Sequence, residues 1–356
     1  MEQQAYWAIG IFLLIYALII SEKIHRTIIA MLGGLLMVGF GIVDQETALH
    51  HIDFNTLGLL IGMMIIVSIT ADTGLFKFIA VWAAKKSKGN PVRILIALAL
   101  ITAVASAFLD NVTTVLLMVP VTFSITRQLR VPPIPFLLTQ IIASNVGGTA
   151  TLIGDPPNIM IGSAVKELTF MSFISNLAPI AAIVMIIYVP IFILLFRKQI
   201  KTTPELTQSI MDLDEKELIA DPQLLRKCLT VLGITMLGFF LHQSLHLESA
   251  TVALAGAFLL LLLTGEHMME AAFTKVEWTT IFFFVGLFVL VSGLVETGVI
   301  SKLAAQAKKD ATAVERLQAK QAKAMAKLEA KLVSAAQKPK KAAKRKKKPA
   351  AKKAEK

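Results

Sequence analysis

Two polar interruptions within otherwise apolar, membrane-length sequence are the strongest constraint on this chain. The first is DNVTT at residues 110–114, and the second is SNVGGTATLIGDPPN at residues 144–158. A bilayer core offers backbone groups no water, so non-helical backbone persists there only where protein or a water-filled cavity satisfies it. Ionisable side chains in such segments cost about 2.5–3.5 kcal/mol to insert, which makes Asp110 and Asp155 candidate functional residues. The interruptions therefore predict a transporter.

The composition predicts an all-α polytopic integral membrane protein. Apolar residues make up 55% of the chain and charged residues 17%, with a mean hydropathy of +0.69, far from the average of soluble globular proteins. Residues 7–20 lack the basic leader and small-residue cleavage site of a signal peptide, so we expect a retained first helix. The sequence holds no phosphate-binding GxxxxGK[ST] motif, so we expect a carrier and not an ATPase or another enzyme.

The charges between the apolar runs predict the orientation of the chain. The loop after the first run is basic, the next is acidic, and the third is again basic. Because Lys and Arg favour cytoplasmic loops, we expect the N-terminus outside, in the plasma (inner) membrane. The runs of spanning or near-spanning length are residues 5–21, 27–42, 54–72, 170–196, 226–245, 250–264 and 277–296.

The first interruption predicts a re-entrant hairpin over residues 94–126. Its first arm has 16 residues, about 24 Å as a helix, and basic residues lie at both ends of the hairpin. The alternative is one ordinary crossing that places Asp110 at a membrane interface. In a hairpin, the tip brings three polar residues near the membrane midplane: Asp110, Asn111 and Thr113.

The second interruption predicts one discontinuous helix over residues 133–165, broken for about fifteen residues. The carbonyl end of the first half can coordinate cations, and the amide end of the second half favours anions. Pro156 and Pro157 can begin the second half because the first turn of a helix needs no amide donors. The alternative is a surface turn between two short core helices.

An internal repeat aligns residues 27–80 with residues 251–304 at a shift of 224 without a gap, so that Asp53 meets Glu277 and Gly62 meets Gly286. If the hairpin does not cross, the first copy makes five crossings, and an odd number inverts the second copy. Inverted repeats are a common plan of secondary transporters, with sites at the repeat interface. Counterparts of the two interruptions do not occur at the matching later positions, so we expect the second repeat to be incomplete.

The end of the chain differs in composition from the remainder. Residues 308–356 hold 18 Lys and Arg against 4 Asp and Glu, which leaves 18 basic and 20 acidic residues before them. We expect this tail to be part helical and part disordered, and such tails bind nucleic acid or anionic lipid. The predicted parts are a first transmembrane repeat (1–196, with the hairpin 94–126 and broken helix 133–165), a hydrophilic linker (197–225), a partial second repeat (226–306) and a Lys/Ala-rich tail (307–356).

The two motifs carry a family resemblance. SAFLDNVTTVLLMVP at residues 106–120 and SNVGGTATLIGDPPNIMIGSA at residues 144–164 resemble the ArsB/NhaD-type permeases of the ion transporter superfamily, which include arsenite, sodium/proton and citrate or dicarboxylate carriers. The family has two such hairpin and broken-helix sets, whereas this chain carries one. The resemblance implies a homodimer in the membrane lipid and a transport site that includes Asp110, Asn111, Thr113, Ser144, Asn145, Gly148, Thr149, Asp155 and Asn158.

The residue types in the interruptions favour an inorganic ion. Carboxylate, amide, hydroxyl and carbonyl oxygens are hard ligands suited to sodium, for which we expect Asp110, Asn111, Asn145 and Thr149, or to a proton on a carboxylate. Neither interruption contains Arg or Lys to hold a carboxylate substrate. We therefore place sodium/proton exchange or arsenite extrusion ahead of citrate or dicarboxylate transport, and expect no cofactor beyond the coupling ion. The remaining alternative is a non-transporting membrane protein with a basic binding tail.

Overall fold

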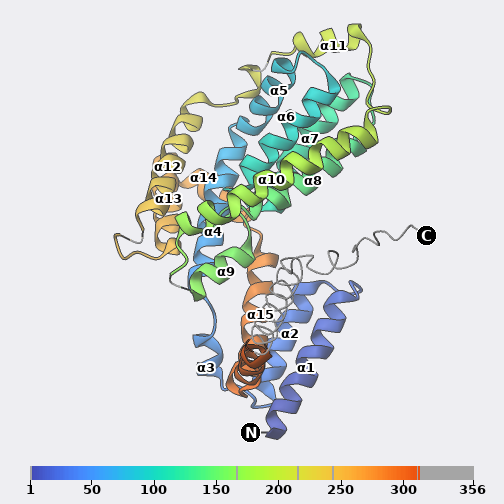
Figure 1. The fold of residues 1–356 in the computed structure, drawn as a ribbon. Helices are drawn as coiled ribbons and strands as arrows, with labels where there is room; N and C mark the ends of the chain where they lie inside the picture. The colour runs from blue at the N-terminus through green and yellow to red at the C-terminus, as the bar shows by residue number, and fades with distance from the viewer. Residues whose placement is uncertain (1, 166, 215, 243, 311, 313–356) are drawn as a thin grey trace, which may run out of the picture. The chain divides into compact units, whose positions relative to one another are not determined.

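The computed structural model describes residues 2–165, 167–214, 216–242, 244–310 and 312, and within them the chain is helical without strands, which confirms the predicted all-α class (Figure 1). The helices are α1 (Glu2–Ile20), α2 (Arg26–Gly39), α3 (Gln45–His50), α4 (Phe54–Asp72), α5 (Leu75–Lys86), α6 (Pro91–Ser106), α7 (Asn111–Gln128), α8 (Ile134–Gly148), α9 (Pro156–Ala164), α10 (Phe170–Phe196), α11 (Pro204–Met211), α12 (Pro222–Leu241), α13 (Ser249–Thr264), α14 (Glu266–Thr274) and α15 (Trp278–Glu296).

Each apolar run of the sequence coincides with one of these helices. Within the described residues, α1, α4, α10, α12 and α15 are long and apolar enough to cross a membrane, while α2, α6, α8 and α13 are shorter apolar helices. Many of their large apolar side chains are exposed, for example Leu262 at 80% and Ile186 at 72%. Such surfaces suit lipid and not water, so the helices are those of a polytopic membrane protein.

The chain divides into two compact units. One comprises residues 1–10 and 293–356, in which residues 299–310 are helical; the other comprises residues 11–292 and contains both polar interruptions. The predicted basic tail over 307–356 falls mostly on residues 311 and 313–356, which lie outside the described part of the chain. The candidate site lies within residues 11–292.

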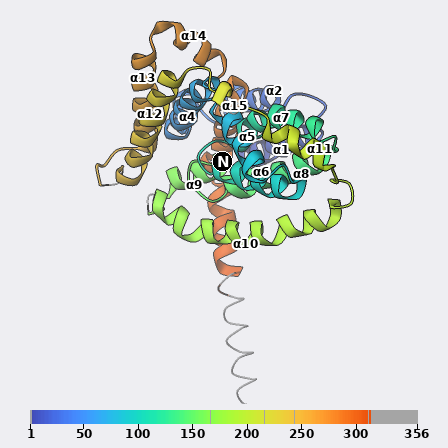
Figure 2. The same ribbon diagram turned by 90° about the horizontal axis from the view of Figure 1, so that it is seen from above.

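A first helix group in residues 11–292 consists of α4, α12 and α13, where α4 and α12 both pack against α13 (Figures 1 and 2). The contact is close because it uses a glycine: a Cβ at Gly62 of α4 would lie 2.7 Å from the carbonyl carbon of Ala253 on α13. Small residues let helix backbones approach in this way where the surrounding lipid is as apolar as the side chains. Gly62 therefore sets the distance between α4 and α13.

The hairpin and the broken helix form a second group. Helices α6 and α7 pack against α8, and α10 lies along α8 (Figure 1). Leu98, Met118 and Phe136, one from each of α6, α7 and α8, are fully buried in the same apolar cluster. This apolar core packs the two arms of the hairpin against α8, and it lies several residues from the hairpin tip in both arms.

One predicted length is wrong. The break in the discontinuous helix is shorter than fifteen residues, because residues 144–148 complete α8 and residues 156–158 begin α9. The hydrophilic segment 197–225 contains α11, and α12 begins within it at Pro222. Asp221 caps α12 by accepting hydrogen bonds from the backbone N–H groups of Gln223 (2.8 Å) and Leu224 (3.0 Å). A capping Asp followed by Pro is a local start signal that outweighs the polar composition of this segment.

Candidate functional site

The hairpin tip places Asp110 at the beginning of a helix. Helix α6 ends at Ser106, and Asp110 is the N-cap of α7, where its carboxylate accepts a hydrogen bond from the backbone N–H of Thr113 at 2.8 Å. A carboxylate is stabilised there by the unpaired amides and by the positive end of the helix dipole. The local sequence thus turns the chain between the two arms and holds a half-buried carboxylate at the turn.

The break between α8 and α9 satisfies its own backbone. The Asn158 side-chain amide donates to the carbonyl oxygens of Thr149 (3.3 Å) and Thr151 (2.9 Å), and the backbone N–H of Gly154 donates to the Thr151 hydroxyl (3.2 Å). The Thr151 hydroxyl in turn donates to the carbonyl oxygen of Ala107 in the hairpin tip. Internal hydrogen bonds of this kind are the condition under which irregular backbone survives at membrane depth.

Asn158 acts mainly as a structural brace, which leads to a testable prediction. Replacing Asn158 by Ala removes two hydrogen bonds, each of which contributes about 1 kcal/mol net. We expect the Asn158→Ala variant to lose about 1–2 kcal/mol of unfolding free energy, measured by chemical or thermal unfolding in detergent.

The matched control is Asn176→Ala. The Asn176 amide donates to Ser172 within its own helix at 2.7 Å and is exposed, so its loss costs little. Equal destabilisation by the two variants would contradict the bracing role of Asn158.

Besides the hydrogen bond from Thr151 to Ala107, two side-chain contacts join the hairpin tip to the broken helix. The Ser106 hydroxyl donates to the carbonyl oxygen of Ser144 at 2.7 Å, and the Asn111 amide donates to the Asn145 side-chain oxygen at 2.8 Å. The backbones of α8 and α6 are also in direct contact at Gly147 and Ala103. A Cβ at Gly147 would lie only 2.0 Å from the carbonyl oxygen of Ala103. The structure therefore brings together the two interruptions, which lie 34 residues apart in sequence at Asn111 and Asn145.

The predicted site residues do not all point to one place. Asp155 precedes α9 as its N-cap without a side-chain capping bond and is close enough to Asp110 for the two charges to repel. The Ser144 side chain is buried and its hydroxyl donates to Ile141 in its own helix at 2.9 Å. Thr149 is exposed and its hydroxyl donates to Val146 at 2.8 Å, while Gly148 lies against the backbone of Gly154.

A cavity of about 200 Å³ lies beside the hairpin tip and contains polar residues that the sequence analysis did not select. Asp110 and Asn111 line it together with Arg26, Glu277 and Thr280, and Leu60, Met64, Val112, Pro156, Pro157, Phe283 and Phe284 complete its wall. The Glu277 carboxylate accepts a hydrogen bond from the Thr280 hydroxyl at 3.1 Å. The Arg26 guanidinium carbon lies 5.2 Å from the centre of the Phe283 ring, within the range of a cation–π contact.

Glu277 and Arg26 are the other charged residues that line the cavity beside Asp110. The charges of Asp110 and Arg26 act on the Glu277 carboxylate, and the Thr113 hydroxyl lies beside it. The internal repeat could have pointed to Glu277, because Glu277 aligns with another acidic residue, Asp53. Glu277 itself lies outside both polar interruptions. Arg26 carried no signal beyond its contribution to a basic loop.

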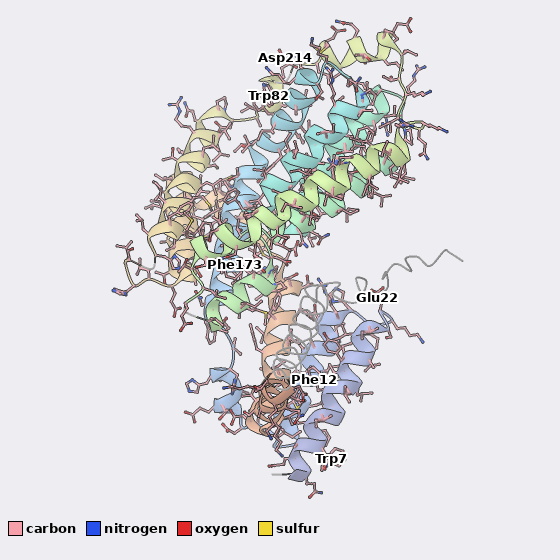
Figure 3. All side chains as sticks on the ribbon, viewed as in Figure 1. Trp7, Phe12, Glu22, Trp82, Phe173 and Asp214 are labelled. Atoms are coloured by element: carbon pink, nitrogen blue, oxygen red, sulfur yellow. The ribbon has the colours of Figure 1, made fainter. Side chains whose placement is uncertain are left out.

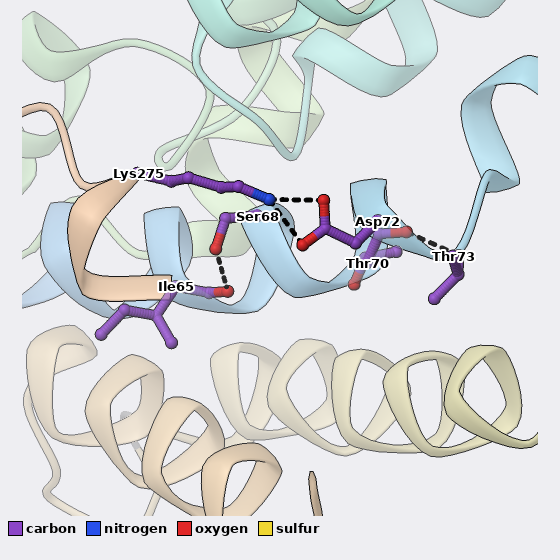
Figure 4. A network of polar contacts seen from close by, with 6 residues as sticks. All are labelled: Ile65, Ser68, Thr70, Asp72, Thr73 and Lys275. Atoms are coloured by element: carbon purple, nitrogen blue, oxygen red, sulfur yellow. Dashed lines mark hydrogen bonds and ion pairs between the residues drawn. The ribbon is translucent and has the colours of Figure 1, made fainter. Parts of the chain in front are cut away.

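An ion pair holds the segment that carries Glu277. Lys275 contacts the Asp72 carboxylate at the end of α4, next to Ser68 and Thr73, which bond within the α4 backbone (Figure 4). Both partners are partly exposed, so the pair contributes little to stability. The pair joins the end of α4 to the connection between α14 and α15, two residues before Glu277.

Comparison with known proteins places this architecture in a family. The family model described as citrate transporter (CitMHS) matches residues 16–320. The uncharacterized transporter Rv2685 of Mycobacterium tuberculosis is 43% identical over 301 residues, which are 83% of this chain and 70% of the relative. The 46 kDa membrane protein of Mycobacterium leprae is 40% identical over the same coverage.

A human relative matches over a smaller share of its own length. The P protein of Homo sapiens is 34% identical over 380 residues, which cover 86% of this chain and 45% of the P protein. These matches confirm the resemblance to ion transporter permeases that the two motifs carry. The chain belongs to the citrate transporter (CitMHS) family of membrane transporters.

Proposed function

We propose that this protein is a secondary active transporter that moves an inorganic ion, by sodium/proton exchange or arsenite extrusion, through a site at the hairpin tip. The observation that carries the proposal is the gathering of carboxylates around the cavity: Asp110 and Glu277 line it, and Asp155 lies within electrostatic reach of Asp110. The three carboxylates outnumber the single Arg, so the net charge of the site is negative. In a low-dielectric site, binding a cation or a proton stabilises a carboxylate that has no basic partner.

The size of the cavity supports a small ion. Its volume of about 200 Å³ is below the 300–1,000 Å³ typical of small-molecule pockets. Asp110, Asn111, Glu277 and Thr280 contribute side-chain oxygen atoms to its otherwise largely apolar wall, and such hard donors suit sodium. We propose Asp110, Asn111, Asn145 and Thr149 as the sodium ligands; the Asn111–Asn145 hydrogen bond already joins two of them, so a cation there would compete with that bond.

Reciprocal glycine contacts support the proposed inverted repeat. Gly62 on α4 lies against Ala253 on α13, and Gly286 on α15, its partner in the repeat, lies against Ala30 on α2. Each copy thus supplies a helix that packs on a helix of the other copy, and the contacted alanines lie within one residue of equivalent positions, since Ala253 corresponds to Ile29 at the shift of 224. With alternating basic and acidic loops, this arrangement supports alternating access in a plasma membrane with the N-terminus outside.

Reconstitution tests the proposal. The purified chain is placed in proteoliposomes, and fluxes of sodium, protons, arsenite and citrate are measured with and without imposed gradients. We expect gradient-driven exchange of sodium against protons, or flux of arsenite. No flux of any of the four would contradict transport by this chain and favour the non-transporting alternative.

Citrate transport is the second candidate, because the structure places Arg26 in the cavity. Neither interruption contains a basic residue, yet the guanidinium of Arg26 lines the same space as Asp110 and can hold a carboxylate substrate. The description of the matching family also favours this candidate.

The variant Arg26→Gln separates the two candidates. If citrate is the substrate, we expect citrate uptake to fall by more than about tenfold, because a charge-assisted hydrogen bond contributes about 1.5–3 kcal/mol. If an inorganic cation is the substrate, we expect no loss of its flux, because the change removes a positive charge from beside the carboxylates. The control is Lys23→Gln, a basic residue of the same loop that does not line the cavity.

A further inference from the structure

A second cavity lies between α4, α5, α6 and α12 and, unlike the cavity beside the hairpin tip, has no charged residue in its wall. It has a volume of about 590 Å³ and an almost entirely apolar wall that includes Val67, Ile79, Val104, Phe108 and Leu232. Val104 is 63% exposed, so the cavity is an open groove on the surface of the helix bundle. In a protein of this family the surface around such helices is bathed in lipid.

The length of the groove matches one leaflet of a bilayer. Along α6 and the turn that follows it, the wall extends over the ten residues from Leu100 to Leu109; α6 itself ends at Ser106, and nine steps of helical rise correspond to about 14 Å. Half of a bilayer hydrocarbon core is about 15 Å. An acyl chain entering from one leaflet therefore fills the groove along its length.

Basic and aromatic side chains follow the groove-lining residues along α5 and α6, outside the groove itself. Arg93 lies seven residues before Leu100 on the groove-facing stripe of α6, and Lys86 lies seven residues after Ile79 on the corresponding stripe of α5. Both are exposed. Trp82 lies on α5 between them and the apolar part, 49% exposed (Figure 3), at a position suited to a membrane–water interface.

We propose that this groove is a binding site for an anionic phospholipid. One acyl chain occupies the apolar groove, and the phosphate group lies beside Arg93 and Lys86, as anionic headgroups do at basic pockets between transmembrane helices. Phe108 and Leu109 form the deep end of the groove and directly precede Asp110, so the bound chain contacts the hairpin tip. The proposal needs only a membrane-embedded chain and does not rest on the transported substrate.

A single introduced thiol allows the site to be tested without a transport assay. Cys228 is buried and is the one cysteine of the chain, so a fluorophore on the variant Val104→Cys reports on the groove alone. The full chain is reconstituted in mixed vesicles of phosphatidylcholine and phosphatidylglycerol. Brominated acyl chains, which quench nearby fluorophores, are carried by one lipid or by the other at equal fraction.

We expect stronger quenching when phosphatidylglycerol carries the bromine. The double change Lys86→Gln and Arg93→Gln should remove this preference, by up to about fivefold for each basic residue. Lys77→Gln is the matched control, because Lys77 is an exposed lysine on the opposite face of α5 and should leave the preference unchanged.

Three results would overturn the proposal. Equal quenching by the two lipids would show no selectivity for the anionic headgroup. Absence of quenching by both would show that protein, such as a second copy of the chain, covers the groove. Equal loss of preference with Lys77→Gln would reveal a general effect of surface charge.

Discussion

The variant Asp110→Asn is expected to lose more than about tenfold of gradient-driven flux, equivalent to about 1.4 kcal/mol in the transport barrier. Asn is as good an N-cap as Asp, so the substitution keeps the hydrogen bond from the Thr113 amide that starts α7. It removes the charge that we propose binds a cation and the carboxyl group that we propose carries a proton. Flux in proteoliposomes and unfolding in detergent are measured on the same preparation, and we expect the second to change little.

Asp221→Asn is the control for this prediction. Asp221 also caps a helix through two backbone amides, but it is exposed and lies outside the cavity that Asp110 lines. Flux should be unchanged in this variant. Wild-type flux in Asp110→Asn would remove Asp110 from the proposed site.

The variant Gly147→Ala is expected to destabilise the second helix group by about 1–3 kcal/mol or more. The added Cβ would lie 2.0 Å from the carbonyl oxygen of Ala103, a backbone atom that cannot rotate aside, so α8 must move away from α6. That movement also lengthens the hydrogen bond from Ser106 to Ser144 and shifts Asn145 from Asn111. We therefore expect a lower unfolding temperature in detergent together with a loss of flux.

Gly39→Ala tests whether the effect comes from this contact. A Cβ at Gly39, in the last turn of α2, meets nothing within 4 Å, and Ala is about 0.5–1 kcal/mol better than Gly inside a helix. This variant should be neutral or slightly stabilised. If Gly147→Ala were equally harmless, α6 and α8 would not be in backbone contact in the membrane.

Local signals in the sequence were sufficient for the hairpin and for the existence of the break. Polar residues 110–114 end one apolar run and cap the next, and Gly and Pro surround Asp155, so both irregular segments follow from residue type. The residues at which the irregular segments begin and end were harder to predict from the sequence. Residues 144–148 include Ser, Asn and two Gly, which favour an irregular backbone, yet packing of α8 on α6 keeps them helical.

The composition of the candidate site was accessible only in part. Asp110 and Asn111 stood out because they interrupt an apolar run, whereas Arg26 and Glu277 lie at helix beginnings where charge is ordinary. Nothing local distinguishes such residues from the charges of any loop. They join the site because α2 and α15 come together, as Gly286 against Ala30 shows.

The sequence by itself determined the helical class, the membrane environment and the two polar interruptions, because hydropathy and helix-breaking residues act over one or two turns. Only the tertiary structure decided that Asp110 shares a cavity with Glu277 and Arg26, and that an apolar groove ends at Phe108 and Leu109. Both depend on which helices touch. That choice is made by close contacts between residues such as Gly62 and Ala253, nearly two hundred positions apart, whose pairing no local pattern encodes.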